Sequence, residues 1–132
     1  MPRPKRKRLI EHPPHVDGFK PFGVPMKNLE PVILLYEEYE AMRLADYDDM
    51  NQEQAADKMQ VSRPTFTRIY ERARKNVAKA FVEGKAIMIE GGDFHSKNLW
   101  YKCGDCQKLN VSDLEMAICS YCQAENLRLL NG

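Results

Sequence analysis

The four cysteines of this 132-residue chain form two Cys-x-x-Cys pairs within its last 30 residues. Cys103 and Cys106 make the first pair, Cys119 and Cys122 make the second, and twelve residues separate the pairs. A two-residue gap lets two thiolates converge on one ion, and the intervening segment can return the chain to complete a tetrahedron. This spacing predicts a structural zinc site in which protein sulfur fills all four positions and none is left open for catalysis.

Other chemistry also fits four cysteines: an iron site, a redox-active pair, or two disulfides, which are rare inside cells. Leu99–Tyr101 before the first pair and Leu127–Leu130 after the second predict short flanking strands. Residues 93–132 are too few to bury a stable core unaided, and a bound metal ion would supply folding free energy. We therefore expect a small β zinc ribbon, with zinc favoured over iron.

The net charge of +1, from 20 bases and 19 acids, conceals a strong segregation along the sequence. Residues 36–57 carry eight acids and one base, whereas residues 63–79 carry six bases and one acid. Five further bases precede them without an acid, namely Arg3, Lys5, Arg6, Lys7 and Arg8. We expect an arm that follows a DNA backbone or enters the minor groove. The alternative is a merely solubilising tail.

Three helices are predicted in the middle of the chain. Apolar residues at helical spacing begin at Tyr36 and stop near Ala45, before four turn-forming residues. Asn51 is a suitable cap for a second helix over 52–60, and Ser62 caps a third helix that runs to Glu83, before Gly84. Two helices joined by about three residues, with the second one basic, are typical of a helix-turn-helix.

The third helix, residues 62–83, separates into two faces on a helical wheel. Its apolar face comprises Phe66, Ile69, Tyr70, Ala73, Val77, Ala80 and Phe81. Its amino-terminal side chains are expected near base edges or flanking phosphates in a major groove, namely Ser62, Arg63, Thr65, Thr67 and Arg68. The bases that follow on the polar face, Arg72, Lys75 and Lys79, are expected to contact phosphates. The alternative is an ordinary helical hairpin with a solvated basic face.

The chain is expected to divide into three regions. Seven of the eight prolines precede residue 32, so residues 1–31 are expected to form a basic arm and extended segments. Residues 32–92 are expected to form the helix-turn-helix domain, with a short strand at 86–89 that pairs with Val32–Leu34 or across a dimer. Residues 93–132 complete a fold that we predict to be mainly α, with the ribbon as a β appendage.

Residues 1–92 resemble a family of short prokaryotic proteins of unassigned function, described as predicted DNA-binding proteins. The resemblance rests on ordered matches at Met1–Lys5, Phe19–Pro21, Gly23, Pro25, Glu38, Glu40–Ala41, Arg43–Asp46, Gln52–Ala56, Val61–Arg63, Thr65–Phe66, Arg68–Ile69, Ala73–Arg74, Val77–Ala78 and Glu83–Ala86. The block from Tyr36 to Ala80 is also similar to the DNA-binding fourth region of bacterial sigma factors. The resemblance implies a three-helix sigma-like helix-turn-helix and a role in transcription.

Three positions depart from the family pattern. Gln60 stands in the turn where relatives carry Gly, and a left-handed residue there would be slightly strained. Pro64 replaces a polar residue, often Gln, which removes one base contact. Leu35 occupies the place where a Ser, Thr or Asp cap is usual.

The sequence predicts a cytoplasmic, site-specific DNA-binding transcription regulator without enzymatic activity. We expect a homodimer on two half-sites, with the ribbon contacting RNA polymerase, another protein or more DNA. No transmembrane or signal segment is present, and no catalytic motif stands out; His12, His15 and His95 are assigned no role. Two alternatives stay open: a metal- or redox-responsive regulator, and an adaptor or RNA-associated protein that acts through its ribbon.

Overall fold

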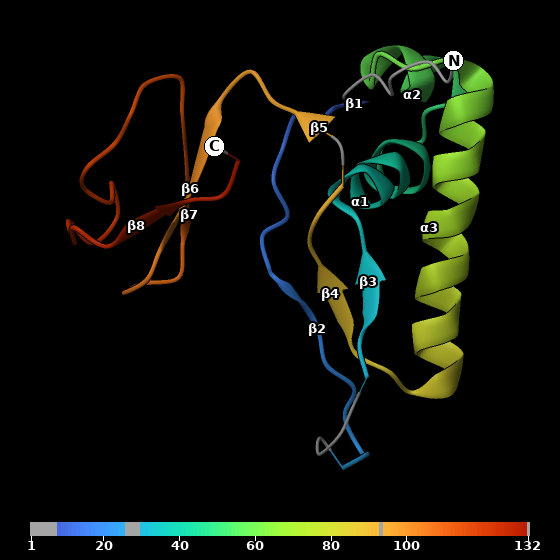
Figure 1. Ribbon diagram of the computed structural model, residues 1–132, viewed down its shortest axis with the longest axis horizontal. Helices are drawn as coiled ribbons and strands as arrows, with labels where there is room; N and C mark the ends of the chain where they lie inside the picture. Colours follow the sequence, from blue (N-terminus) through green and yellow to red (C-terminus); the bar gives the residue numbers. More distant parts are fainter. Residues whose placement is uncertain (1–7, 26–29, 93, 132) are drawn as a thin grey trace, which may run out of the picture. The chain divides into compact units, whose positions relative to one another are not determined.

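Figure 1 shows the computed structural model, which describes residues 8–25, 30–92 and 94–131. The chain forms two compact units, Met1–Phe94 and His95–Gly132. The first unit contains the helices, and the second consists of strands and turns around the four cysteines.

The helices of the first unit lie in the middle of the sequence. α1 (Tyr36–Met42) continues into a π-helical turn, η1 (Arg43–Tyr47), and is followed by α2 (Gln52–Lys58) and α3 (Arg63–Glu83). Two of these helices are only seven residues long, so their stability depends on packing against α3. None of the helices in the described part of the chain is long and apolar enough to cross a membrane.

The predicted caps of α2 and α3 are confirmed. The Asn51 side chain accepts a hydrogen bond from the Gln54 N–H at 2.8 Å, and Ser62 Oγ accepts one from the Thr65 N–H at 3.3 Å. Each bond satisfies a backbone donor that has no partner within the helix. The two caps therefore fix where the chain turns from α2 into α3.

Two residues at helix ends, in the α2–α3 turn and after α3, adopt the left-handed backbone conformation. Gln60 in the α2–α3 turn has a φ of 58°, and Gly84, which ends α3, has a φ of 67°. Gly84 adopts this conformation without strain because it has no Cβ, whereas Gln60 carries a small cost. At the start of α1, the Leu35 side chain cannot accept a hydrogen bond, but Glu38 Oε1 accepts the Leu35 N–H at 2.8 Å and satisfies that backbone donor.

Five short strands accompany these helices. They are β1 (Arg8–Leu9), β2 (Gly18–Phe19), β3 (Val32–Leu34), β4 (Ile87–Ile89) and β5 (Phe94–His95). β2, β4 and β3 form a three-stranded sheet in that order, and β1 pairs with β5, the strand at which the first unit ends. Segments from the two ends of this unit are therefore joined by backbone pairing.

The central strand of the sheet, β4, is antiparallel to β2 and parallel to β3. Val32 lies opposite Ile87 and Leu34 opposite Ile89, with the three helices as the crossover that parallel pairing requires. Of the two pairings expected for the strand at 86–89, the one with Val32–Leu34 is therefore present. Gly18 allows β2 to approach, because a Cβ there would lie 1.9 Å from the Ile87 carbonyl oxygen.

Two apolar clusters hold the first unit together. The larger one joins α1, η1, α2 and α3 through residues that are fully or almost fully buried: Ala41, Leu44, Ala55, Ala56, Met59, Phe66 and Ile69. The smaller one packs the sheet on α3 through Leu34, Ala73 and Ile89. α1, α2 and β3 all lie on one side of α3 in Figure 1, so its other side faces away from the core.

The predicted mainly α class, with a three-helix domain as its centre, is wrong. The described residues contain three α-helices and eight strands in three sheets. The strands of the first unit are two or three residues long, which is too short for the period-two pattern that reveals strands in a sequence. The segment before residue 32 contains β1 and β2, and its residues Leu9 and Ile10 are buried in the first unit.

The assignment of Phe81 to the apolar face of α3 that packs on the core is also wrong. Phe81 is 87% exposed, although the helical wheel places it beside Ala80 and Val77. The cores that α3 covers extend no further than Val77 and Ala80, so the last turn of the helix has no element packed against Phe81. Periodicity predicts which residues share a face, but not how far along the helix that face is covered.

The second unit is an antiparallel sheet of β6 (Leu99–Cys103), β7 (Leu109–Ser112) and β8 (Leu127–Leu129), in the order β7-β6-β8. Both flanking strands predicted around the cysteine pairs are therefore present. The central strand, β6, carries the fully buried Trp100, and Tyr101 beside it is almost fully buried. β6 also ends in the first cysteine, so the sheet positions the first half of the cysteine cluster.

Candidate metal centre and nucleic-acid interface

The four cysteine sulfur atoms converge as the sequence spacing predicts. All four lie within 4.8 Å of one another, and none of the cysteines forms a disulfide. The Sγ atoms of Cys103 and Cys122 are 3.6 Å apart, and those of Cys106 and Cys119 are 3.7 Å apart. A tetrahedral ion with metal–sulfur bonds of about 2.3 Å requires sulfur atoms about 3.8 Å apart. The cluster is therefore able to hold a metal ion.

Each Cys-x-x-Cys pair sits in the same backbone turn. The Gln107 N–H donates to the Cys103 carbonyl oxygen at 3.0 Å, and the Gln123 N–H donates to the Cys119 carbonyl oxygen at the same distance. Both glutamines are left-handed, with φ of 64° and 65°. Sequence reasoning missed this repetition, although the sequence carries a signal for it, since Gln follows the second cysteine of each pair.

Backbone and side-chain N–H groups point at the sulfur atoms. The N–H of Asp105 lies 3.4 Å from Cys103 Sγ, and that of Tyr121 lies 3.4 Å from Cys119 Sγ. The buried Asn110 adds its Nδ2 at 3.5 Å from Cys119 Sγ. Such donors stabilise thiolates and hold them in orientation, as the groups surrounding metal ligands commonly do. Asn110 has no motif around it, so no sequence pattern indicates its place beside the centre.

The thiol pKa values indicate that the metal-free cluster cannot carry four negative charges easily. The pKa of Cys119 is lowered to about 6, mainly because the Cys122 N–H donates to its sulfur. For Cys122 the Ala124 N–H favours the thiolate, but burial and the neighbouring sulfur atoms outweigh it and raise the pKa to about 12. A bound cation would remove this opposition between neighbouring sulfurs.

The basic side chains predicted to contact DNA lie exposed on α3. They are Arg63, Arg68, Arg72, Lys75 and Lys79. No ion pair within 4.0 Å neutralises any of them among the residues that the structure describes. Arg68, Arg72, Lys75 and Lys79 share one face, along which the helix rises about 17 Å. The side of α3 away from the core is therefore a long surface of positive charge.

The smaller polar residues at the start of α3 make contacts within the protein. Ser62 Oγ donates to Thr65 Oγ1 at 2.9 Å, and Thr65 Oγ1 also accepts from the Arg68 guanidinium at 3.2 Å. Thr67 Oγ1 hydrogen-bonds to the Gln52 side chain and donates to the Arg63 carbonyl oxygen at 3.0 Å. Ser62 and Thr65 thus stabilise the start of α3, and Thr67 links α3 to α2.

The basic arm is only partly within the described residues. Arg3, Lys5, Arg6 and Lys7 lie outside them. Arg8, assigned to the same DNA-contacting arm, is instead buried, with its Nε 3.1 Å from a carboxylate oxygen of the buried Glu37. This position corrects the prediction: Arg8 anchors the start of β1 on α1, and its charge is already neutralised.

The fold and site define a chain of two units, in which a unit of helices and short strands is followed by a four-cysteine cluster able to hold a metal ion. The profile of the family described as "Protein of unknown function DUF134" matches residues 1–97, and the chain belongs to this family. A protein of Chloroherpeton thalassium named "UPF0251 protein" is 45% identical over 130 residues, covering 96% of this chain and 85% of the relative.

Relatives of the same name occur in other bacteria. One from Clostridium botulinum strain Hall is 43% identical over 129 residues, covering 96% of this chain and 82% of its own. One from Halothermothrix orenii is 45% identical over 106 residues, covering 80% of this chain and 78% of its own. No solved structure matches the chain. The family profile ends before Cys103, whereas the first two alignments cover nearly all of this chain.

Proposed function

We propose that this protein is a site-specific, double-stranded DNA-binding regulator of transcription, in which α2 and α3 act as a helix-turn-helix. The observation that carries the proposal is the row of exposed bases on α3, unpaired within the described residues and directed away from the core. A solvated helix face of a monomer ordinarily mixes acids and bases, whereas here Arg68, Arg72, Lys75 and Lys79 lie within about 60° of one another on the helical wheel. DNA phosphates are the abundant polyanion that such a surface fits.

The amino-terminal half of α3 would enter the major groove. Arg63 and Arg68 are the exposed side chains that could donate bidentately to guanine. Ser62, Thr65 and Thr67 would hold the turn in place and reach flanking phosphates at most, because their hydroxyls are engaged within the protein. Arg72, Lys75 and Lys79 would bind phosphates, which position the helix without specifying sequence.

Acidic residues on other surfaces support a single orientation on DNA. Asp48 and Asp49 after η1 and Glu53 and Asp57 on α2 are exposed. Their charge repels phosphates wherever it is not compensated, so α3 is the surface of the described first unit that attracts a duplex. The residues Arg3, Lys5, Arg6 and Lys7 would add phosphate or minor-groove contacts and steepen the salt dependence.

The four-cysteine centre would hold one structural zinc ion. Four thiolates favour zinc or iron, and the closed cluster leaves no position for a substrate. The zinc would stabilise the second unit, and the proposed activity is binding rather than catalysis. Elemental analysis of protein purified without chelator should give about one zinc per chain. Much less than one zinc, or iron in its place, would contradict this assignment.

A homodimer would match two half-sites on the operator, since one helix-turn-helix has a small footprint.

The second unit would contact RNA polymerase or another protein. Its exposed apolar side chains between the two cysteine pairs, Leu114 at 72% and Ile118 at 45%, favour a protein partner. The same surface is the observation that supports the second candidate function, an adaptor acting chiefly through this unit. A metal- or redox-responsive regulator is the further alternative.

Selection of duplexes from a random-sequence pool tests the DNA-binding proposal. The full chain should enrich a sequence motif, and Arg68→Ala should weaken binding to the enriched duplex by about tenfold and relax the preference at one or two base pairs. Lys20→Ala removes an exposed base of the first unit away from α3 and should have little effect. Enrichment of no motif, or equal binding by Arg68→Ala and wild type, would overturn the major-groove assignment.

A further inference from the structure

A cavity of about 800 Å³ lies within the first unit, away from the basic face of α3. Its apolar lining comes from the sheet, α1 and α3, and includes Leu34, Met42, Val77, Ile87 and Ile89. The volume falls in the range of about 300–1,000 Å³ that is usual for small-molecule sites. An opening of this size and apolarity is suited to a ligand with a hydrophobic body.

Aromatic rings and one turn of π-helix form another part of the wall. Phe19, Tyr39 and Tyr47 line the cavity, with Tyr47 at the end of η1. Burial raises the pKa of Tyr39, so its ring stays a neutral phenol at physiological pH. Neutral aromatic faces attract cations through the ring quadrupole. Single π-helical turns also occur frequently at functional sites.

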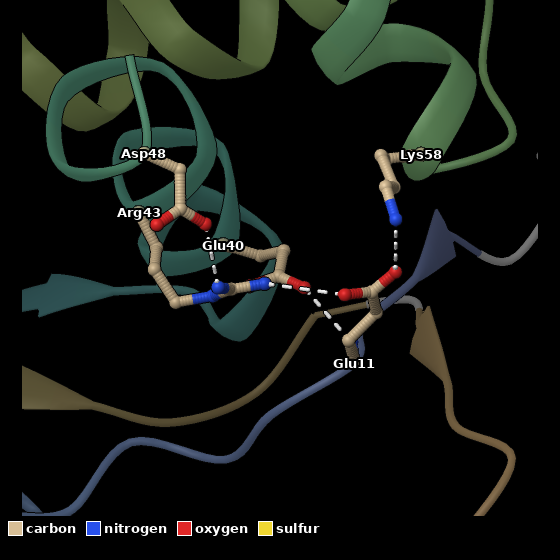
Figure 2. A network of polar contacts seen from close by, with 5 residues as sticks. All are labelled: Glu11, Glu40, Arg43, Asp48 and Lys58. Carbon is tan, nitrogen blue, oxygen red and sulfur yellow. Dashed lines mark hydrogen bonds and ion pairs between the residues drawn. The ribbon is translucent and has the colours of Figure 1, made fainter. Parts of the chain in front are cut away.

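Arg43 lines the cavity, as do His12 and His15, and its charge is already neutralised within the protein, as Figure 2 shows. Its Nε lies 2.5 Å from Glu40 Oε1, one terminal nitrogen lies 3.0 Å from Asp48 Oδ2, and the other lies 3.8 Å from Glu11 Oε2. Burial opposes the charge of Arg43, but these three carboxylates outweigh it and raise its pKa. Arg43 is therefore not available to an anionic ligand.

The remaining acidic side chain of the lining is Asp46. Glu11, Glu40 and Asp48, which compensate Arg43, are not lining residues, and Lys58 lies 3.3 Å from Glu11. Asp46 accepts a hydrogen bond from the Tyr70 hydroxyl at 2.5 Å. No cation lies within 4.0 Å of the Asp46 carboxylate among the described residues. The Asp46 carboxylate is therefore the lining charge that would attract a cation and repel an anion.

We propose that this cavity is a binding site for lipophilic monocations, molecules with an apolar body and a single quaternary or protonated centre. The apolar body lies against the side chains from the sheet and α3. The positive charge lies near Asp46 and the faces of the neighbouring aromatic rings. The site is independent of the proposed DNA surface, because the lining includes none of the exposed bases of α3.

Two probes of the same shape and opposite charge test this proposal on the full chain. Tetraphenylphosphonium should bind saturably at one site by titration calorimetry, and tetraphenylborate about tenfold more weakly or not at all. Asp46→Asn should reduce the preference for the cation. Asp49→Asn, which makes the same change at an exposed residue outside the lining, should leave it unchanged.

The comparison of the two probes on the wild-type chain decides the outcome even if Asp46→Asn fails to fold. Absence of saturable phosphonium binding would overturn the proposal, and so would borate binding of equal or greater strength. Equal effects of Asp46→Asn and Asp49→Asn would refute the assigned position of the charge. Phe19→Ala, which alters a 62% exposed lining residue, should also weaken phosphonium binding.

Discussion

The two units of this protein are held together by different means. The first buries large apolar side chains from several elements, among them Leu44, Met59, Phe66 and Ile69. In the described part of the second, the buried apolar residues are Trp100, Tyr101, Cys103 and Cys119, and two of these belong to the sulfur cluster. A unit of fewer than about 40 residues rarely folds on its core alone. Stability thus depends on packing in one unit and on four sulfur atoms in the other.

The largest expected effect is that of metal removal. The sole tryptophan of the chain, Trp100, reports on the second unit, whereas helical circular dichroism reports on the first. A strong chelator, or Cys103→Ser, should shift tryptophan emission to the red while the helical signal is retained, because structural zinc supplies about 10 kcal/mol or more.

Simultaneous loss of both signals would show that the units are not independently stable. An unchanged Trp100 emission in protein proven to be metal-free would show that the sheet of the second unit folds without metal. Either result would contradict the account in which the first unit is stabilised by its apolar core and the second by metal binding to its cysteines.

The next largest effect is expected from Arg43→Ala in the first unit. Glu40 is fully buried, and removal of Arg43 leaves its carboxylate without the cation 2.5 Å away. We expect a loss of about 3–5 kcal/mol in the free energy of unfolding. Urea titration followed by helical circular dichroism measures this loss, and the Trp100 signal should be unaffected.

Lys58→Ala is the matched control for that measurement. Lys58 is half-exposed and contacts the same network only through Glu11 at 3.3 Å. An exposed ion pair of this kind contributes less than about 1 kcal/mol. Equal losses in the two variants would mean that burial of Glu40 does not decide the strength of the network.

A smaller effect concerns the pH dependence of the first unit. Burial raises the pKa of Glu38, against the opposing effects of the Leu35 N–H and of Arg72. The folded chain therefore retains this proton at pH values where the unfolded chain has lost it, and this group makes the free energy of unfolding fall as the pH rises above 4.5.

Glu38→Gln should remove that decline while its amide oxygen still accepts the Leu35 N–H. Urea titrations of wild type and variant between pH 4.5 and 7 measure the difference. Glu53→Gln, at an exposed acid in the first turn of α2, is the control. Parallel pH profiles for wild type and Glu38→Gln would refute this assignment.

Local features were predictable from the sequence, and long-range ones were not. The caps at Asn51 and Ser62 and the left-handed Gln60 depend on residues within one turn of the chain. The cysteine cluster was also predictable because its spacing alone limits the geometry. In contrast, the Glu11 backbone N–H binds Glu40 Oε2 across 29 residues, and no local pattern indicates such a contact.

The strands of the first unit show the same limit. β2 and β4 pair residues from opposite ends of the unit, and each strand is too short to alternate visibly. The burial of Arg8 is likewise a long-range contact, since Arg8 lies 3.1 Å from Glu37 on α1 and the next residue, Leu9, donates its N–H to the Met59 carbonyl oxygen. The run of bases in the sequence therefore gave no sign that Arg8 is buried against an acid.

Salt dependence is the sharpest test of the proposal that α3 of the first unit binds duplex DNA through its exposed bases. Affinity for a selected duplex should be measured between about 50 and 200 mM salt for wild type, for Lys75→Ala with Lys79→Ala, and for Lys20→Ala. The double variant should reduce the slope of log K against log salt by about 2, because two phosphates are no longer neutralised, and Lys20→Ala should leave it unchanged. A slope that is the same in all three proteins would contradict the proposal.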